Sequence, residues 1–365
     1  MKKRYLLTPG PTPVPEEVLR AMAEPIIHHR TDEYRKIFGE AVEGLKYVFQ
    51  TKGDVLTLTS SGTGAMEAAC VNLLSKGDKA LVVSGGKFGE RFTDICKAYG
   101  IDAAVLDVPY GYSVDPADVK KELAGNKDIK AVFATHCETS TGVLNDIKAI
   151  AAITKDYGAA LVVDAISSLG ANEIKTDEWG IDIVVSGSQK GLMIPPGLAF
   201  LSVSEKAWKM MSSGDLPKYY FNLSKYKKSL EKADSPFTPA ISLVIALNKS
   251  LAIIWKEGIE NVIARHARLA AMTRKAMADM GLELFSKGTP SDSLTAVVVP
   301  EGIDGSKLVK LISEKYNITI AGGQGEMKGK IFRIAHLGYM TEEDIRTGIS
   351  AIKSALADLG YKKGE

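Results

Sequence analysis

Cysteine is scarce in this chain, whose 365 residues include only Cys70, Cys96 and Cys137. An odd number of cysteines in apolar or helical surroundings favours free, buried thiols over disulfides, and therefore a reducing, cytoplasmic location. Their spacing matches no zinc motif, so we expect no metal site.

A long apolar run and a strong charge bias are also missing. No segment is apolar over the length needed to cross a bilayer, so we expect no membrane partner. The net charge is only +2, and the lysines are scattered rather than gathered into a stripe, so we expect no nucleic-acid partner. The hydrophobic content of 45% and charged content of 25% are those of a globular protein, and the length favours two domains.

The first part of the chain alternates between strand-like and helix-like segments. This βαβ rhythm predicts an α/β fold whose mostly parallel, seven-stranded sheet is covered by helices on both faces. In such sheets, ligands bind beyond the carboxyl ends of the strands. The expected strands are residues 54–59, 80–84, 103–108, 131–135, 160–163, 183–186 and 198–203, and the helices between them include residues 65–74, 91–99, 116–123 and 147–157.

The rest of the chain predicts an arm and a smaller C-terminal α/β domain. Prolines at every second position from 9 to 15 exclude a helix, so residues 1–15 form an extended arm. We place the large domain at residues 16–255 and the small domain at residues 256–365. Residues 214–239 are polar and rich in lysine, serine and proline, which indicates an irregular excursion. In the small domain we expect strands at residues 295–299, 318–320 and 331–335 and helices at residues 306–316 and 342–359.

Lys190 is the most informative residue of the sequence. It lies in Ser-Gly-Ser-Gln-Lys-Gly, directly after an expected strand, where a loop can present one amine partly shielded from water. Asp164 ends an earlier apolar strand with a carboxylate. A Schiff-base lysine and an acid for a pyridinium nitrogen are what a pyridoxal 5′-phosphate (PLP) site requires. Taken alone, the lysine is also typical of a solvated surface and the aspartate of a turn.

Two segments near the first strands have features of an anion and ring site. Ser61, Gly62 and Thr63 open a helix, where glycine, hydroxyls and the helix dipole favour an anion. This segment lacks the GxGxxG and GxxxxGK[ST] patterns, and an ordinary helix N-cap is the alternative. Phe88 follows the second strand, where a flat ring either stacks on a cofactor or joins the core.

Two later segments add polar groups. Residues 136–142, His-Cys-Glu-Thr-Ser-Thr-Gly, follow the fourth strand and are either ligand contacts or an ordinary polar loop. Arg333 interrupts the apolar strand Ile-Phe-Arg-Ile-Ala. An inward-facing guanidinium suits bidentate capture of a carboxylate, whereas on an edge strand it would face water. Alternation alone leaves both possibilities open.

In this order, the segments resemble the class V, fold-type I PLP-dependent enzymes, and specifically the alanine–glyoxylate and serine–pyruvate aminotransferases. The resemblance extends over nearly the whole chain, and its motifs are specific when taken together. They are Thr8-Pro9-Gly10-Pro11-Thr12, Ser61-Gly62-Thr63, Phe88-Gly89-Glu90-Arg91, residues 136–142, Val163-Asp164, residues 186–190, Pro195-Pro196-Gly197, Thr238-Pro239 and Phe332-Arg333-Ile334.

The resemblance implies a role for each residue at the cofactor ring. Lys190 would hold the cofactor aldehyde as a Schiff base and move the substrate proton. Asp164 would keep the pyridine nitrogen protonated. Phe88 would stack on the ring, and Thr139 would lie near its phenolic oxygen.

The resemblance also implies how phosphate and substrate are held. Arg333 would bind the substrate α-carboxylate, assisted by the backbone of Gly10. The phosphate would be shared between two subunits, which makes a homodimer with active sites at the interface part of the mechanism. Its ligands would be Ser61, Gly62, Thr63 and Gln189, with Thr238 of the partner subunit.

We therefore expect a PLP-dependent aminotransferase with ping-pong chemistry, in which serine or alanine is the donor and glyoxylate or pyruvate the acceptor. An acidic donor, aspartate or phosphoserine, is the alternative, since His28-His29-Arg30 could reach a side-chain anion; otherwise these residues form a surface cluster. A lyase of the cysteine-desulfurase kind would need a late cysteine, and none follows Cys137. A non-catalytic binding protein would have little need for both Lys190 and Asp164.

Overall fold

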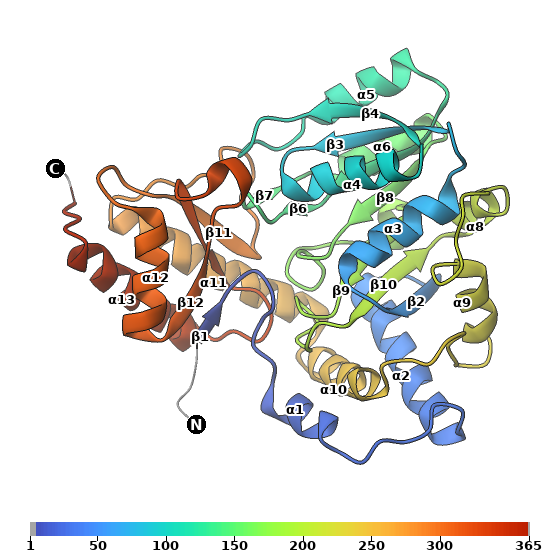
Figure 1. Ribbon diagram of the computed structural model, residues 1–365, viewed down its shortest axis with the longest axis horizontal. Helices are drawn as coiled ribbons and strands as arrows, with labels where there is room; N and C mark the ends of the chain where they lie inside the picture. The colour runs from blue at the N-terminus through green and yellow to red at the C-terminus, as the bar shows by residue number, and fades with distance from the viewer. Residues whose placement is uncertain (1–4, 364–365) are drawn as a thin grey trace.

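The computed structural model describes residues 5–363 and contains two principal β-sheets (Figure 1). The larger sheet has seven strands, in the order β2-β10-β9-β8-β5-β3-β4. Strand β10 is antiparallel to both of its neighbours, and the other pairs are parallel. These strands are β2 (Asp54–Thr59), β3 (Lys79–Ser84), β4 (Asp102–Asp107), β5 (Ile129–Thr135), β8 (Ala160–Asp164), β9 (Ile183–Gly187) and β10 (Leu198–Val203).

Helices cover both faces of this sheet because its central strands are apolar on both sides. On one face α2, α5, α6 and α10 enclose a core that includes Phe49 and Phe200. On the other face α3, α4, α8 and α9 enclose a core that includes Met66 and Phe133. The helices of this part are α1 (Glu16–Met22), α2 (Asp32–Phe49), α3 (Gly62–Leu73), α4 (Lys87–Ala98), α5 (Pro116–Gly125), α6 (Ile147–Asp156), α7 (Thr176–Trp179), α8 (Glu205–Met211), α9 (Leu223–Leu230) and α10 (Ile241–Glu257).

The smaller sheet has the order β1-β12-β13-β11 and is packed against long helices at the other end of the molecule (Figure 1). Its core includes Leu7, Phe332 and Ile352. A short ribbon, β6 and β7, lies beside the junction of the two parts. The elements are β1 (Tyr5–Leu7), β6 (Cys137–Glu138), β7 (Val143–Leu144), α11 (Ile259–Asp279), β11 (Leu294–Val298), α12 (Gly305–Tyr316), β12 (Ile318–Gly322), the 3-10 turn η1 (Gly325–Met327), β13 (Ile331–Ala335) and α13 (Glu342–Asp358).

One expectation from the sequence was incomplete and one was wrong in detail. The extended N-terminal arm joins the small sheet, since Tyr5–Leu7 forms β1 and Leu7 pairs with Ile320. Residues 1–4 of the expected arm lie outside the described residues. The excursion at residues 214–239 contains α9, whose Leu223 and Tyr226 are buried one turn apart. In both cases a distant packing partner, absent from the local pattern, determines the structure.

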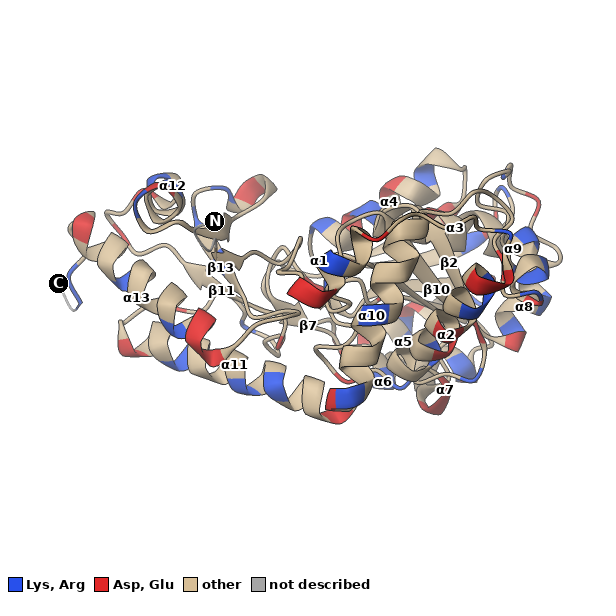
Figure 2. Ribbon diagram, turned by 90° about the horizontal axis from the view of Figure 1, so that it is seen from below, with Lys and Arg blue, Asp and Glu red and all other residues tan. Residues whose placement is uncertain are grey.

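The helical stretch between the two sheets breaks at Gly258, which has a φ of 84°. Helix α10 packs on α1 and α2, whereas α11 packs on β11 and α13. The domain limits 16–255 and 256–365 stay a prediction. Seen from below, both basic and acidic residues are distributed over the helices (Figure 2). No helix within residues 5–363 is both long and apolar enough to cross a membrane.

Candidate active site

Lys190 lies in a tightly bonded turn just beyond the carboxyl end of β9. The hydroxyl of Ser188 donates to the carbonyl of Pro195 at 2.8 Å and accepts from the amide of Leu198 at 3.2 Å. This turn directs the Lys190 side chain inward, where it is only 9% exposed. The Lys190 amine donates a 2.5 Å hydrogen bond to the carbonyl oxygen of Pro9.

The N-terminal arm closes over Lys190 and requires glycine at position 10. Gly10 has a φ of 138°, and a Cβ atom there would lie 2.5 Å from the lysine Nζ. Thr12 anchors the arm, because its hydroxyl donates to the Lys190 carbonyl at 2.9 Å and its amide to the Gln189 carbonyl at 3.1 Å. Any side chain at position 10 would displace the amine.

Asp164 ends β8, the strand next to β9, and is buried. One carboxylate oxygen accepts from the amide of Ile166 at 2.8 Å. Burial raises the pKa of Asp164 to about 7, and this effect outweighs the opposing charges of Lys190 and Arg91. Because a desolvated carboxylate gains from a nearby cation, the site is suited to a protonated ring nitrogen.

The amine of Lys190 is correspondingly easy to deprotonate. Burial lowers the pKa of Lys190 to about 8, although the charge of Asp164 opposes the shift. Arg333 and Arg91 lower the same pKa further by like-charge repulsion. A neutral amine near physiological pH is what attack on an aldehyde and transfer of a proton require.

The expected phosphate residues converge at the N-terminus of α3. Ser61 is the N-cap residue, yet its hydroxyl makes no capping hydrogen bond. Gly62 is packed so closely that a Cβ would lie 2.5 Å from a side-chain carbon of Ile166. Gln189 points to the same place, and its buried Oε1 atom has no hydrogen-bond partner among the described residues. The backbone amides and hydroxyls at this helix N-terminus can donate to a phosphate, and Gln189 could do so through its side-chain NH2 group.

Phe88 is held in place by Glu138, a residue to which the sequence reasoning gave no individual role. The buried Glu138 carboxylate accepts from the amides of Phe88 and Gly89, each at 3.1 Å. It therefore caps the N-terminus of α4 from a position 50 residues away in sequence. The signal was present in the polar run 136–142, but its partner could not be read from the sequence.

Arg333 joins the small sheet to this edge of the large one. It is 4% exposed and lies on β13, which has neighbours on both sides, so it is not an edge-strand arginine facing water. Its guanidinium donates to the carbonyls of Thr139 at 2.8 Å and of Gly322 at 2.8 and 3.0 Å. The Thr139 hydroxyl in turn donates to that of Ser167 at 2.6 Å. Burial lowers the pKa of Arg333 to about 10, which leaves it charged at neutral pH.

Two sequence candidates lie outside this constellation. Thr238 is exposed, in a loop whose neighbours include Thr59 and Phe237. Arg30 forms a 2.7 Å ion pair with Asp234 and donates to the carbonyl of Ser235 at 3.0 Å. The Arg30 side chain therefore fixes a loop.

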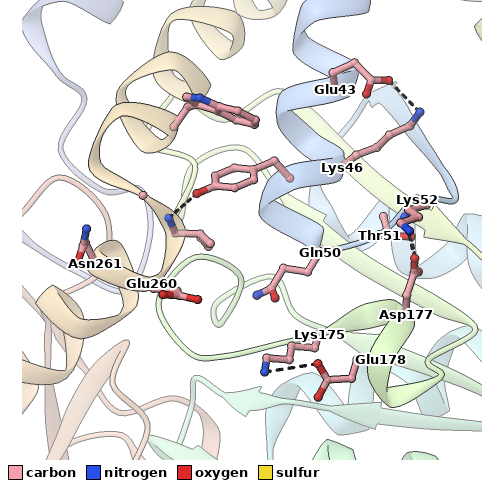
Figure 3. Close-up of a pocket in the computed structure, with 14 residues that line it drawn as sticks. Glu43, Lys46, Gln50, Thr51, Lys52, Lys175, Asp177, Glu178, Glu260 and Asn261 are labelled. Carbon is pink, nitrogen blue, oxygen red and sulfur yellow. Dashed lines mark hydrogen bonds and ion pairs between the residues drawn. The ribbon is translucent and has the colours of Figure 1, made fainter.

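A hollow of about 860 Å³ is lined by the end of α2, by α7 and by the junction of α10 and α11 (Figure 3). It contains none of the predicted site residues. Its walls carry Lys46, Lys175, Glu178 and Glu260, and the side chains of Lys175 and Glu178 face each other. Because its charged groups are mixed and partly paired, it offers no counterpart to the site around Lys190.

The residues around Lys190 fit PLP. A buried amine, a desolvated carboxylate, a partly buried aromatic ring and the N-terminus of α3 lie at the carboxyl ends of β9, β8, β3 and β2. Lys190 would hold the aldehyde, Asp164 the ring nitrogen, and the start of α3 the phosphate. This edge is where ligands bind in open parallel sheets.

Comparison with known proteins agrees with this geometry. The family model for aminotransferase class-V matches residues 4–347. The "Soluble hydrogenase, small subunit" of Synechococcus sp. is 45% identical over 98% of this chain and 94% of that protein. The L-aspartate–glyoxylate aminotransferase of Paracoccus denitrificans is 40% identical over 97% of this chain and 91% of its own. The serine–glyoxylate aminotransferase of Methylorubrum extorquens is 36% identical over 99% of this chain and 92% of its own.

A solved structure shows the same fold. The alanine–glyoxylate aminotransferase of Nostoc sp. superposes with a TM-score of 0.93 at 29% identity, covering 98% of this chain and 96% of its own. Fold and site together define a fold-type I, PLP-dependent transaminase. The chain belongs to the class-V aminotransferase family.

Proposed function

We propose that this enzyme transfers the amino group of a small, uncharged amino acid, serine or alanine, to glyoxylate or pyruvate. The number of buried basic side chains at the site supports an uncharged donor. Lys190 and Arg333 are the only buried lysine or arginine side chains among the described residues. One guanidinium suffices for the α-carboxylate shared by all amino acids. The partly buried Arg91 donates instead to the hydroxyl of Thr63 at the start of α3, so no further buried guanidinium is left for a side-chain carboxylate.

Each residue then has a defined task in two half-reactions. PLP, when bound, supplies an aldehyde for the amino group and an electron-accepting ring. Arg333, with the Gly10 backbone, would orient the substrate carboxylate. Lys190 would carry a proton from and to the substrate Cα atom, because its amine is neutral part of the time near pH 8. Asp164 would hold a proton on the ring nitrogen.

The remaining site residues would position the cofactor. Phe88 would cover one face of the ring, and Thr139 would lie at its edge. Ser61, Gly62, Thr63 and Gln189 would surround the phosphate. The support is that the hydroxyl of Ser61 makes no capping hydrogen bond and that Gln189 lies close to the same helix terminus, next to Lys190 in the chain.

A screen of half-reactions tests the donor. The visible absorption of the bound cofactor is followed as alanine, serine, aspartate and phosphoserine are each added to the holoenzyme. Alanine and serine are expected to convert it fastest. Faster conversion by aspartate would replace the proposal with the acidic-donor alternative, which the name of the Paracoccus relative supports.

We also propose a cytoplasmic homodimer in which Thr238 acts on the phosphate held by the partner subunit. The three cysteines are free and buried, as suits a reducing compartment. Large apolar side chains are exposed on the same excursion as Thr238, with Tyr219 at 74%, and a second subunit would cover them.

Complementation tests the shared site. Lys190→Ala and Thr238→Ala subunits are dissociated, mixed and reassociated at limiting PLP. If Thr238 acts in the partner, one site of each hybrid is intact, and activity exceeds that of either parent. Lys190→Ala mixed with Asp164→Asn is the matched control, since both residues act in one subunit and no intact site forms. Absence of recovery in the first mixture refutes the shared site.

A further inference from the structure

Arg91 is a partly buried cation, and the site described above assigns it no role. It lies on the first turns of α4, three residues after Phe88, so both side chains share one helix face. Its guanidinium lies 4.7 Å from the centroid of the Phe88 ring and donates a 3.2 Å hydrogen bond to the hydroxyl of Thr63. Arg91 thus connects the residue expected on the cofactor ring with the residue expected on the phosphate.

No carboxylate of the described residues forms an ion pair with this guanidinium. Within the described part of the chain, Arg91 has no ion pair, and its neighbour Glu90 is already bound to Lys87 at 2.6 Å and to Tyr110. Arg91 borders a small hollow that is also lined by Lys87, Glu90, Asp94 and Gln324, and neither of these two carboxylates forms an ion pair with it. An arginine that faces the site with an uncompensated charge is suited to an anion.

The phosphate cradle needs such a charge. Ser61, Gly62, Thr63 and Gln189 are all neutral, and a helix N-terminus contributes only about +0.5 of a charge. A phosphate monoester carries roughly −1.5 to −2 at pH 7. The groups at the α3 terminus therefore leave most of the anion uncompensated.

The hydrogen bond to Thr63 also fixes a direction. A hydroxyl has one proton and two acceptor lone pairs, so a threonine that accepts from Arg91 keeps its own proton for a further acceptor. The phosphate, at the N-terminus of α3, is the acceptor that the cradle predicts.

We propose that Arg91 stabilises the cofactor phosphate of this enzyme through Thr63. It orients the Thr63 hydroxyl toward the phosphate and supplies the positive charge that the neutral groups at the start of α3 lack. It is a positioning residue, and it gives the Phe-Gly-Glu-Arg motif a second function besides the ring of Phe88. The inference rests on the proposed assignment of Ser61–Thr63 to the phosphate.

Equilibrium dialysis of the full-length protein, freed of bound cofactor, against PLP and separately against pyridoxal tests the inference without reference to turnover. Pyridoxal has the same ring and aldehyde but no phosphate. Arg91→Gln is expected to raise the dissociation constant of PLP roughly ten- to a hundredfold and to leave that of pyridoxal within about twofold. Arg91→Lys keeps the charge, and its dissociation constant for PLP is expected to lie between those of wild type and Arg91→Gln.

Two further variants separate a local from a general effect. Lys87→Gln removes a cation one turn away that is paired with Glu90, and PLP affinity should not change. Thr63→Val combined with Arg91→Gln should cost less than the sum of the single losses, because one residue acts through the other.

Two results would overturn the inference: unchanged PLP affinity in Arg91→Gln, or an equal loss of affinity for PLP and pyridoxal. If PLP affinity is unchanged and aspartate turnover is selectively lost, Arg91 is assigned to a substrate side chain instead. Failure of alanine and serine as donors would refute the proposed donor class and leave the dialysis result standing.

Discussion

Arg333 of the small sheet donates a 2.8 Å hydrogen bond to the backbone carbonyl of Thr139, which follows β6 beside the large sheet. The arginine is thereby held by main-chain oxygens that leave its positive charge unneutralised. Its placement depends on both parts of the fold, so the proposed carboxylate site would form only when the two are docked.

Replacing Arg333 with glutamine should damage every amino donor alike. The loss of a bidentate, charge-assisted contact costs on the order of 2–3 kcal/mol, or roughly thirty- to a hundredfold in kcat/KM. Steady-state constants for alanine, serine and aspartate check this. A loss confined to one donor would show that Arg333 recognises a side chain instead. Arg333→Lys retains charge without the planar fork and should recover only part of the activity.

Replacing Lys190 with alanine should abolish turnover while PLP still binds noncovalently. The amine is the only buried lysine in the described chain and lies within reach of the arm carbonyl at Pro9. Absorbance of the purified variant with added PLP shows binding, and product assays show turnover. Appreciable transaminase activity would refute the assignment. Lys87→Ala, on the same side of the sheet but partly exposed, is the control.

Much of the large sheet was predictable because most of its strands are buried and largely apolar, although the edge strand β4 is mostly exposed. All seven expected strands lie within two residues of those observed, and the carboxylate of Asp164 and the amine of Lys190 fall at adjacent strand ends as expected. Buried parallel strands carry their own signal, since each side chain faces a core.

The start of α4 shows what could not be predicted. The sequence placed it at residue 91, whereas the helix begins at Lys87. Its N-cap, Gly86, has no side chain, and the caps come instead from Glu138 and from the hydroxyl of Ser140, which accepts from the Lys87 amide at 3.1 Å. A helix end capped by tertiary contacts has no local signature. The position of Phe88 and the link from Arg91 to Thr63 were hidden for the same reason.

Glu138 should therefore prove necessary for cofactor binding although it needs no contact with the reacting atoms. Glu138→Ala leaves the amides of Phe88 and Gly89 without acceptors, which costs about 1–3 kcal/mol in unfolding free energy. Urea unfolding and PLP dissociation constants measure the two effects. Glu138→Gln retains one acceptor oxygen, so its stability and its PLP affinity should lie between those of wild type and Glu138→Ala. PLP affinity equal to wild type in Glu138→Ala would contradict a positioning role.

Asp164 should show its burial in the pH dependence of stability. Its folded pKa of about 7 lies above the ordinary value near 3.9, so between these values the folded protein holds a proton that the unfolded chain has lost. Stability of the cofactor-free protein must then fall as pH rises from about 4 to 7, and the deficit persists above pH 7.

Asp164→Asn removes this deficit. The cofactor-free variant should melt higher than wild type at pH 8, with a difference that shrinks toward pH 5, while kcat of the holoenzyme falls by orders of magnitude. Thermal unfolding at both pH values, with Asp182→Asn as a second buried aspartate, checks the first part. A difference in melting temperature that does not change with pH would show that burial does not raise the pKa of Asp164.

Arg30 decides between an uncharged and an acidic donor. Its guanidinium is bound to Asp234 at 2.7 Å and to the Ser235 carbonyl at 3.0 Å, so its charge is already compensated by a loop of the same subunit. Arg30→Ala should leave the preference among alanine, serine and aspartate unchanged, because none of these donors requires it. Steady-state kcat/KM for the three donors provides the measurement. Arg35→Ala, which removes the other cation beside Asp234, is the matched control. A collapse of aspartate or phosphoserine activity in Arg30→Ala alone would mean that Arg30 leaves Asp234 to bind substrate, and the enzyme would then be one with an acidic donor.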